Sequence, residues 1–584
     1  MTERVLHGVA AAPGLVAGPA WIYRPAELSL PPEPAEGAAA PDPEDELARW
    51  RQAREQVKAR LDELAARTRE RAGEEEAAIF EAHRLLVDDP ELDAEVTRRV
   101  REEGQTAAAA VRAATEAFAS MLEQLDDEYL RGRAADIRDV GRQLLAAVLG
   151  VDLEGAAPDR PSVIVARDLT PSDTARWPRE VVLGLVTELG GATSHVAILA
   201  RGAGVPAVAG VTGALAAVSD GQWVVVDGDR GEVVVDPGPE RRREVEDRLR
   251  RREAWQRELA ALRDLPAVTR DGRRIELAAN IGRPEDIAAA EPYGPEGVGL
   301  FRTEFLFLDR SQPPGEEEQY RAYEAAVRAL AGRRLVLRTL DVGADKRLPF
   351  MDWPEELNPS LGWRGARIGL DRPDLLRTQL RAALRAAAGG PVAVMFPMIT
   401  TRDEIRRLRR FVREIEEELA REGVPHGPVQ VGIMVEVPAA ALAARQLAAE
   451  VDFFSIGTND LTQYTLAVDR TSERVAGLYD AFHPAVLRLI LEVGRAAVEA
   501  GIWAGVCGEL GGEPLAAPFL VGAGITELSM SAPALPAVKR VIRGITHADA
   551  RRLAEELVTL GDAAEVKDRL RRFLEERGLW PVDG

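Results

Sequence analysis

The sequence predicts a multidomain α/β protein that consists of an N-terminal α/β domain with an inserted helical bundle, a linker helix, and a C-terminal (β/α)8 barrel. Three observations support this prediction. The chain has 584 residues, which is enough for several separate cores. Helical periodicity dominates residues 44–148. From about residue 265 onward, short strand-like runs alternate with longer helical segments, which is typical of parallel strands joined by crossover helices.

The N-terminal α/β domain is expected to combine residues 1–24 with residues 148–237. Residues 1–24 contain short β-prone runs that are broken by turn residues. Further along, β-branched runs separated by Gly, Asp and Pro predict short strands, and one helical stretch follows His195. The strand candidates are residues 163–165, 181–186, 224–226 and 233–235.

The segment between these two parts, residues 25–147, is expected to form a helical subdomain. It starts with a Pro-, Ala- and Glu-rich stretch, residues 26–46, which indicates a solvated loop. Apolar residues then recur three, four and seven positions apart, and this spacing predicts about four amphipathic helices. Residues 238–263 are strongly charged with a thin apolar stripe, which indicates a linker helix.

Residues 264–584 are expected to form the barrel. Helical segments such as 403–421 and 486–500 lie between eight strand candidates. These candidates are residues 274–281, 297–301, 334–338, 392–396, 429–435, 452–456, 503–507 and 525–530.

Composition excludes several classes of protein. The chain has 75 basic and 96 acidic residues and a net charge of −21, so it is a poor candidate for binding nucleic acid. Its single cysteine, Cys507, excludes intramolecular disulfides and cysteine-based zinc sites. No apolar run reaches the roughly 18 residues of a membrane span, and the N-terminus lacks the pattern of a signal peptide. We therefore expect a cytoplasmic protein without membrane insertion.

The first chemical signal surrounds His195. A strand ending near Thr187 runs into Gly190-Gly191, and Thr193 or Ser194 is placed to cap a helix that starts at the histidine. A helix N-terminus offers unpaired N–H groups to an anion, so this histidine is a candidate phosphoryl acceptor. Taken alone, a histidine in a capped turn more often has only a structural role.

The second signal is a set of polar residues at the ends of barrel strands, where barrel enzymes carry their active sites. Arginines bind phosphate and carboxylate through paired hydrogen bonds, and two carboxylates with substrate oxygens can hold Mg²⁺. Each residue alone has an ordinary structural explanation, but together they predict a small phosphorylated acid as ligand. The set is Arg302, Arg338, Lys346, Arg364, Glu436, Asn459, Asp460, Arg470 and Cys507.

These motifs resemble enzyme I of the phosphoenolpyruvate:sugar phosphotransferase system. The resemblance runs nearly end to end, through the segment 190–201 around His195 and through residues 133–139 and 169–172. Its most specific stretches are GLFRTEFL at 299–306 and FFSIGTNDLTQYTLAVDR at 453–470.

The resemblance implies a function and a role for each matching residue. His195 would carry the phosphoryl group on Nε2, Cys507 would protonate the enolate carbon as pyruvate forms, and Glu436 with Asp460 would hold Mg²⁺. Phosphoenolpyruvate would contact Arg302, Arg338, Asn459 and Arg470, with Asp460, Lys346 and Arg364 close by. Residues 25–147 would dock the phosphocarrier protein HPr, the barrel would form a homodimer, and the α/β domain would be the phosphohistidine domain. Residue 192 is Ala where the family often has a basic residue, which leaves one phosphate contact open.

Two other functions remain as alternatives. A pyruvate-phosphate dikinase or phosphoenolpyruvate synthase shares the histidine and barrel modules, but it needs an ATP-binding domain before the histidine. Only 194 residues precede His195 here, and no Gly-rich nucleotide loop occurs among them. A non-catalytic regulator that binds partners through its acidic surface is the other alternative, and the full residue set of the barrel argues against it.

Overall fold

The computed structural model describes residues 3–25, 28, 30, 42–71, 74–124, 128–151, 153, 157–174, 177–191, 194–308, 310–343, 348–472 and 474–580. The chain divides into two compact units, Met1–Glu253 and Ala254–Gly584. Each unit has its own hydrophobic core, so each is considered by itself. None of the described helices combines the length and the apolarity that a membrane span requires.

The N-terminal unit contains a mixed sheet of eight strands in the order β1-β8-β7-β3-β4-β5-β6-β2. The centre of the sheet is the parallel run β3-β4-β5-β6. Apolar side chains pack on both of its faces, which explains the β-branched runs in the sequence. The strands are β1 (Arg4–His7), β2 (Val9–Ala12), β3 (Leu15–Ile22), β4 (Ser162–Ala166), β5 (Val182–Thr187), β6 (Ala207–Ala209), β7 (Trp223–Asp227) and β8 (Glu232–Val235).

Three short helices belong to this sheet domain: α6 (Pro171–Thr174), α7 (His195–Gly202) and α8 (Ala214–Ala217). The strands expected in residues 163–235 all form. The three-residue strand β6 was not predicted, because its sequence Ala-Val-Ala is too short for a period to show.

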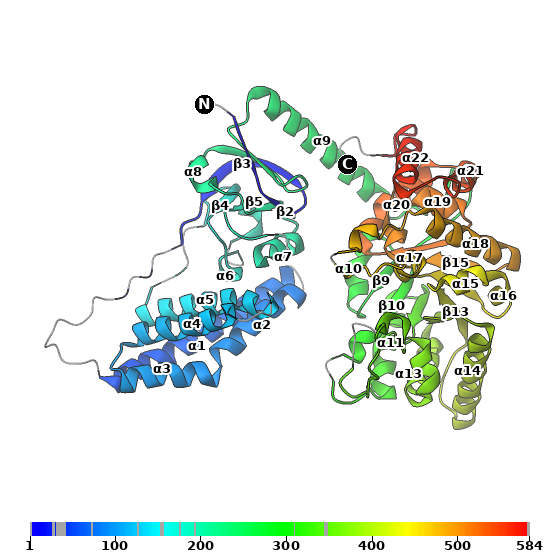
Figure 1. Ribbon diagram of the computed structural model, residues 1–584, viewed down its shortest axis with the longest axis horizontal. Coiled ribbons are helices and arrows are strands. Elements are labelled where there is room, and N and C mark those ends of the chain that lie inside the picture. Colours follow the sequence, from blue (N-terminus) through cyan, green and yellow to red (C-terminus); the bar gives the residue numbers. More distant parts are fainter. Residues whose placement is uncertain are drawn as a thin grey trace. The chain divides into compact units, whose positions relative to one another are not determined.

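The helical bundle is inserted between β3 and β4, which are themselves paired (Figure 1). It contains α1 (Pro43–Arg71), α2 (Glu74–Val87), α3 (Pro90–Glu102), α4 (Ala107–Glu123) and α5 (Glu128–Leu149). The described residues of the bundle thus form five helices, one more than the approximate number expected. Asp89 caps α3 by accepting a hydrogen bond from the N–H of Glu91, and Pro90 at the first helical position cannot continue α2. Most of the expected loop 26–46 lies outside the described residues.

Helix α9 (Pro239–Ala261) occupies the position of the predicted linker helix. Among its residues only Val245 is buried, which agrees with the thin apolar stripe. The boundary between the two units falls within this helix, at Glu253.

The C-terminal unit is a closed barrel of eight parallel strands, as the sequence predicts. Every strand candidate is confirmed to within about two residues. The strands are β9 (Glu276–Ile281), β10 (Val298–Arg302), β11 (Leu335–Arg338), β12 (Val392–Phe396), β13 (Val429–Val435), β14 (Phe453–Ile456), β15 (Trp503–Val506) and β16 (Glu527–Met530).

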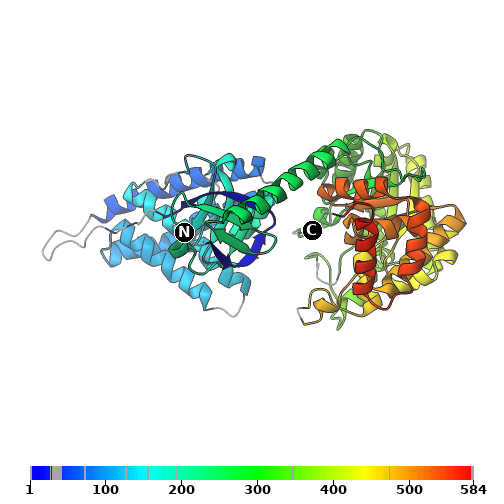
Figure 2. The same cartoon turned by 90° about the horizontal axis from the view of Figure 1, so that it is seen from above.

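Helices lie around the outside of these strands (Figure 2). They are α10 (Asp286–Ala290), α11 (Glu316–Leu330), α12 (Ala366–Asp371), α13 (Pro373–Ala386), α14 (Arg402–Glu422), α15 (Pro438–Leu442), α16 (Ala444–Ala448), α17 (Thr458–Leu466), α18 (Pro484–Ala500), α19 (Ala517–Gly522), α20 (Leu535–Gly544), α21 (His547–Leu557) and α22 (Ala563–Glu575). The large core between strands and helices is separate from a smaller cluster inside the barrel. That inner cluster contains Cys507 and Phe453, and it forms the floor beneath the strand ends.

Candidate active site

His195 is the first residue of α7, as the sequence predicts. Ser194 is the N-cap, and its Oγ accepts a hydrogen bond of 3.4 Å from the N–H of Ala197. The same hydroxyl donates to the carbonyl of Gly191 at 2.8 Å, and Gly190 takes the positive φ of 94° that the turn requires. The backbone therefore presents the histidine at a helix N-terminus. Its side chain lies outside the described atoms, as do the Ala192 and Thr193 positions.

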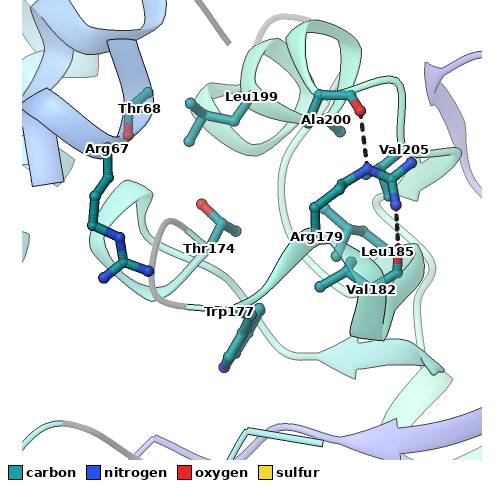
Figure 3. A pocket seen from close by; sticks show the side chains of 11 residues that line it. Arg67, Thr68, Thr174, Trp177, Arg179, Val182, Leu185, Leu199, Ala200 and Val205 are labelled. Carbon is teal, nitrogen blue, oxygen red and sulfur yellow. Dashed lines mark hydrogen bonds between the residues drawn. The ribbon is translucent and has the colours of Figure 1, made fainter. Parts of the chain in front are cut away.

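A cavity of about 150 Å³ lies on the side of α7 that faces the helical bundle (Figure 3). It is lined by Leu199 and Ala200 of α7, by strand β5, and by the C-terminal part of α1. This cavity belongs to the N-terminal unit and is distinct from the set of strand-end residues in the barrel.

The barrel residues predicted from strand ends come together around one cavity of about 480 Å³. Arg302 and Arg338 are the last residues of β10 and β11, Glu436 follows β13, and Asn459 with Asp460 lies in the first turn of α17. Parallel strands of a barrel end at the same rim, which explains why residues far apart in sequence meet here. Eight of the nine candidates line the cavity: Arg302, Arg338, Arg364, Glu436, Asn459, Asp460, Arg470 and Cys507. Lys346 lies outside the described residues.

Two of the four arginines are buried and held by carboxylates. Arg338 pairs with Glu304 at 2.9 Å and with Asp341 at 3.1 Å. Burial opposes the charge of Arg338, but these two carboxylates outweigh it and raise the pKa of the guanidinium above its ordinary value. Its buried Nε has no hydrogen-bond partner among the described atoms, which leaves one donor for a ligand.

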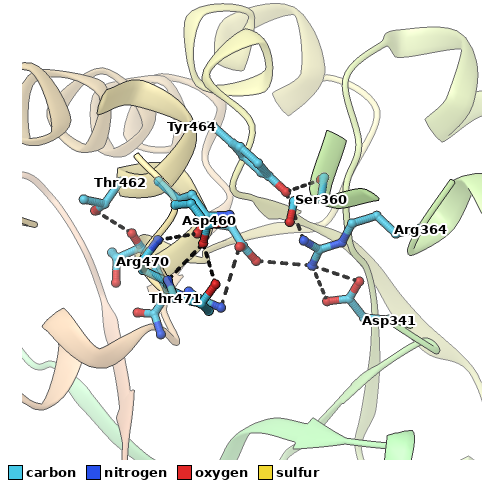
Figure 4. Close-up of polar contacts among 12 residues, drawn as sticks. Asp341, Ser360, Arg364, Asp460, Thr462, Tyr464, Arg470 and Thr471 are labelled. Atoms are coloured by element: carbon cyan, nitrogen blue, oxygen red, sulfur yellow. Dashed lines mark hydrogen bonds and ion pairs between the residues drawn. The ribbon is translucent and has the colours of Figure 1, made fainter. Parts of the chain in front are cut away.

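Arg364 is the second buried arginine of the cavity. One Nη of its guanidinium lies 3.1 Å from Asp341 and 3.3 Å from Asp460, and the other donates to the hydroxyl of Tyr464 at 2.9 Å (Figure 4). That hydroxyl in turn donates to the carbonyl of Ser360 at 2.6 Å. The guanidinium is thus fixed on both sides before any ligand binds, which reduces the entropy that a ligand must remove.

Arg302 and Arg470 are exposed and comparatively free. Arg302 makes no hydrogen bond or ion pair within the described chain, whereas Arg470 lies 3.8 Å from Asp460 and also interacts with the side chain of Tyr479. Asn459 is oriented from the opposite side by Glu509, which accepts from its amide at 3.1 Å and donates its own N–H to the amide oxygen at 3.0 Å. An anion entering the cavity therefore meets two solvent-exposed arginines and a hydrogen-bonded amide.

The carboxylates of the cavity fit a divalent cation. Glu436 is 1% exposed, and one of its oxygens accepts a 2.7 Å hydrogen bond from the N–H of Met398. Burial, with the nearby charges of Asp341 and Asp460, raises the pKa of Glu436 well above its ordinary range. Asp460 has a buried oxygen that accepts no hydrogen bond from the described residues. Crowded carboxylates, one with an oxygen that accepts no hydrogen bond, can be stabilised by a cation such as Mg²⁺.

Two protein ligands are too few for a site made by protein alone. In the part of the chain that the structure describes, no three His, Cys, Asp or Glu side chains converge as a metal site. Mg²⁺ usually keeps waters and binds substrate phosphates beside one or two carboxylates, so the pair suits this ion when a phosphorylated ligand is present.

Cys507 lies at the floor of the cavity with 2% of its surface exposed. Burial raises the pKa of its thiol to about 11, so the proton stays on sulfur at neutral pH. The backbone carbonyl of Cys507 accepts from the amide of Asn280 at 3.0 Å, which fixes the position of the residue. The thiol can therefore act as an acid toward a group bound in the cavity.

Several residues that shape this site were given no role by the sequence analysis. Tyr464 could have been found because it stands four positions after Asp460 on α17 and thus on the same helical face. Glu304, Asp341 and Glu509 each stand close behind a strand end. Met398 carries no sequence signal at all, although it adopts a positive φ of 57° and its N–H donates to Glu436.

Comparisons with known proteins agree with this geometry. Family models for PEP-utilising enzymes match three stretches of the chain: the N-terminal domain at residues 7–133, the mobile domain at 158–231, and the PEP-binding domain at 256–547. The chain is 44% identical to a phosphoenolpyruvate-protein phosphotransferase of Bacillus sp. (strain S), with 98% of each sequence covered. It is 43% identical to the enzyme of the same name from Haemophilus influenzae, with 98% of this chain and 100% of that sequence covered.

The chain belongs to the phosphoenolpyruvate-protein phosphotransferase (enzyme I) family. It is accordingly a phosphoenolpyruvate-dependent transferase. Among solved structures, it is similar to the NMR solution structure of Enzyme I (nEIt), at 38% identity over 43% of this chain and 99% of that one, with a TM-score of 0.36. The matched PEP-binding segment contains every barrel residue of the cavity described above.

Proposed function

We propose that this member of the enzyme I family moves the phosphoryl group of phosphoenolpyruvate to His195 and then to a histidine of the phosphocarrier protein HPr, with release of pyruvate. The observation that carries the proposal is the 480 Å³ cavity, whose lining brings together four arginines, five carboxylates that include Glu436 and Asp460, the amide of Asn459 and the protonated thiol of Cys507. This reaction would be the first step of sugar uptake through the phosphotransferase system.

Phosphoenolpyruvate carries two anionic ends, and the cavity offers cations to both. Arg302 and Arg470 are exposed at the mouth of the cavity, whereas Arg338 and Arg364 are buried and held by carboxylates. Asn459 supplies a neutral donor between them, with Lys346 as a further cation that the resemblance implies. Bidentate contacts of guanidinium groups with phosphate and carboxylate give both affinity and orientation.

Glu436 and Asp460 are the residues proposed to hold Mg²⁺. When bound, the ion would offset negative charge on the phosphate and carboxylate oxygens of the substrate. Burial, followed by the nearby charges of Asp341 and Asp460, raises the pKa of Glu436, and a bound cation would oppose this shift by stabilising the carboxylate.

In the transfer, the bond between phosphorus and the enol oxygen breaks and a bond from phosphorus to Nε2 of His195 forms. The electron pair of the broken bond passes to the oxygen, which leaves pyruvate enolate. The Cys507 thiol then gives its proton to the enolate carbon, and the resulting thiolate recovers a proton from solvent. A thiol with a pKa of about 11 donates readily to a carbanion, and the arginines stabilise the developing charge.

The deciding experiment measures transfer of a labelled phosphoryl group from phosphoenolpyruvate to the protein. Full-length protein is incubated with Mg²⁺ and phosphoenolpyruvate labelled in its phosphate, beside His195→Ala and, as a matched control, His426→Ala. Acid-labile, base-stable label is expected on wild type and His426→Ala only, and it should pass to added HPr. Label from ATP instead of phosphoenolpyruvate would indicate a dikinase-type reaction, and no label from either would leave a regulator.

Two further properties follow from the resemblance alone. We propose that the bundle, residues 25–147, docks HPr, and that the barrel pairs with a second copy in the cytoplasm. Sedimentation equilibrium of the full chain measures the second property directly, and a monomer at micromolar concentration would contradict it.

A further inference from the structure

The cavity of about 150 Å³ in the N-terminal unit is apolar and well formed, and the reaction does not use it. Most of its walls are buried side chains from β5, α7 and the segment between α6 and β5. Trp177, Val182, Leu185, Leu199, Ala200 and Val205 are each no more than 9% exposed. The cavity opens to solvent at one side, and a volume of this size can accommodate a single aromatic ring.

The walls of the cavity are held by contacts outside it, so filling the cavity does not require them to move. Arg179 donates to the carbonyls of Val182, Ala203 and Gly204 at 2.8–3.1 Å and so ties the end of α7 to the start of β5 (Figure 3). The indole of Trp177 lies edge-on to the rings of Tyr23 and Trp21, at 5.1 and 5.7 Å. A preformed pocket lowers the entropic cost of binding.

The positive charge of the residues at the mouth of the cavity favours an anionic ligand. The described lining residues include two arginines and no carboxylate. Arg179 donates to backbone carbonyls. Among the described residues, the guanidinium of Arg67 approaches the carboxylate of Glu63 only to 3.9 Å, and the side chains of Arg67 and Glu63 are both exposed to solvent. In Figure 3 the Arg67 side chain extends from α1 toward the segment that carries Thr174. A guanidinium beside an apolar pocket pairs with a carboxylate whose apolar part fills the pocket.

We propose that this cavity binds a small aromatic carboxylate, with its ring against Leu199, Ala200 and Trp177 and its carboxylate on Arg67. Leu199, Ala200 and Ala203 belong to the helix and cap that begin at His195. A bound acid would therefore contact α7, the helix that begins at His195, near its C-terminal end. The binding itself does not rest on the proposed function.

The test measures binding by the full chain without any phosphoryl transfer. Benzoate is titrated into protein labelled at Leu and Val methyl groups, with benzamide as a neutral probe of nearly the same shape. Saturable shifts are expected at Leu199, Val182 and Val205, with a benzoate Kd of about 1 mM or tighter. Benzamide should bind at least fivefold more weakly.

Matched variants test whether benzoate binds in this cavity. Ala203→Leu, at the exposed mouth of the cavity, should weaken benzoate at least fivefold, whereas Ala216→Leu, at an exposed position of α8, should not. Arg67→Gln should remove the preference for benzoate over benzamide, whereas Arg51→Gln on the same helix should keep it. Absence of saturable shifts, or equal affinity in Ala203→Leu, would overturn the proposal. Because no substrate is present, that result is independent of whether His195 accepts phosphate.

Discussion

At the scale of single residues, the barrel site depends on groups whose ionisation is set by burial. Cys507 illustrates this, because its thiol pKa of about 11 lies above the ordinary value of 9.0. At pH 9 the native chain should carry roughly fifty times less thiolate than an unfolded chain. Reaction of the single cysteine with iodoacetamide should thus rise steeply only above pH 10.

The same shift affects stability with a defined sign. The unfolded thiol loses its proton near pH 9 and the native thiol near pH 11, so the free energy of unfolding should fall as pH rises through this window. Cys507→Ser serves as the control that removes both the label and this part of the pH dependence. A native alkylation midpoint near pH 8.5 would contradict the assigned proton.

Tyr464 is a positioning residue for Arg364. Tyr464→Phe removes the hydroxyl that accepts from Arg364 at 2.9 Å and donates to Ser360. Loss of one hydrogen bond to a charged group should raise KM for phosphoenolpyruvate about tenfold and change kcat less. Steady-state kinetics measure both constants. The control Tyr320→Phe removes a hydroxyl bonded to Glu324 on α11, and it should leave KM unchanged. Equal KM values in the two variants would count against this role.

At the scale of elements, the barrel interior restricts which residues the strands can carry. A Cβ on Gly432 of β13 would lie 2.4 Å from the ring of Phe453, which is stacked on Trp503 at 4.2 Å. Gly432→Ala should therefore reduce the free energy of unfolding by about 1–3 kcal/mol through overpacking. Gly315 has open space around it and an ordinary φ of −70°, so Gly315→Ala is the matched control and should change stability by less than about 0.5 kcal/mol. Urea unfolding followed by circular dichroism measures both, and similar values would refute the packing argument.

At the scale of the whole molecule, the histidine and the substrate cavity belong to different compact units. Under the proposed function, sustained turnover requires the two units to meet for transfer to His195 and to separate for transfer to HPr. A covalent crosslink between engineered cysteines, one in each unit, should abolish steady-state transfer to HPr. Variants that carry only one of the two engineered cysteines, treated with the same reagent, are the control. Cys507 is buried and should not react with the crosslinker. Unimpeded transfer by the crosslinked protein would refute the need for movement.

Sequence patterns were sufficient to predict the barrel, the inserted helices and the list of residues at the barrel rim. They were sufficient because strand and helix periods are local patterns, and because parallel strands of a barrel all end on one side. Only the tertiary structure decided which arginines are clamped and which are free, how deeply Glu436 and Cys507 are buried, and that Tyr464 meets Arg364 across 100 residues of chain. These properties arise from contacts between distant segments, and the low local dielectric that shifts their pKa values exists only after the chain has packed.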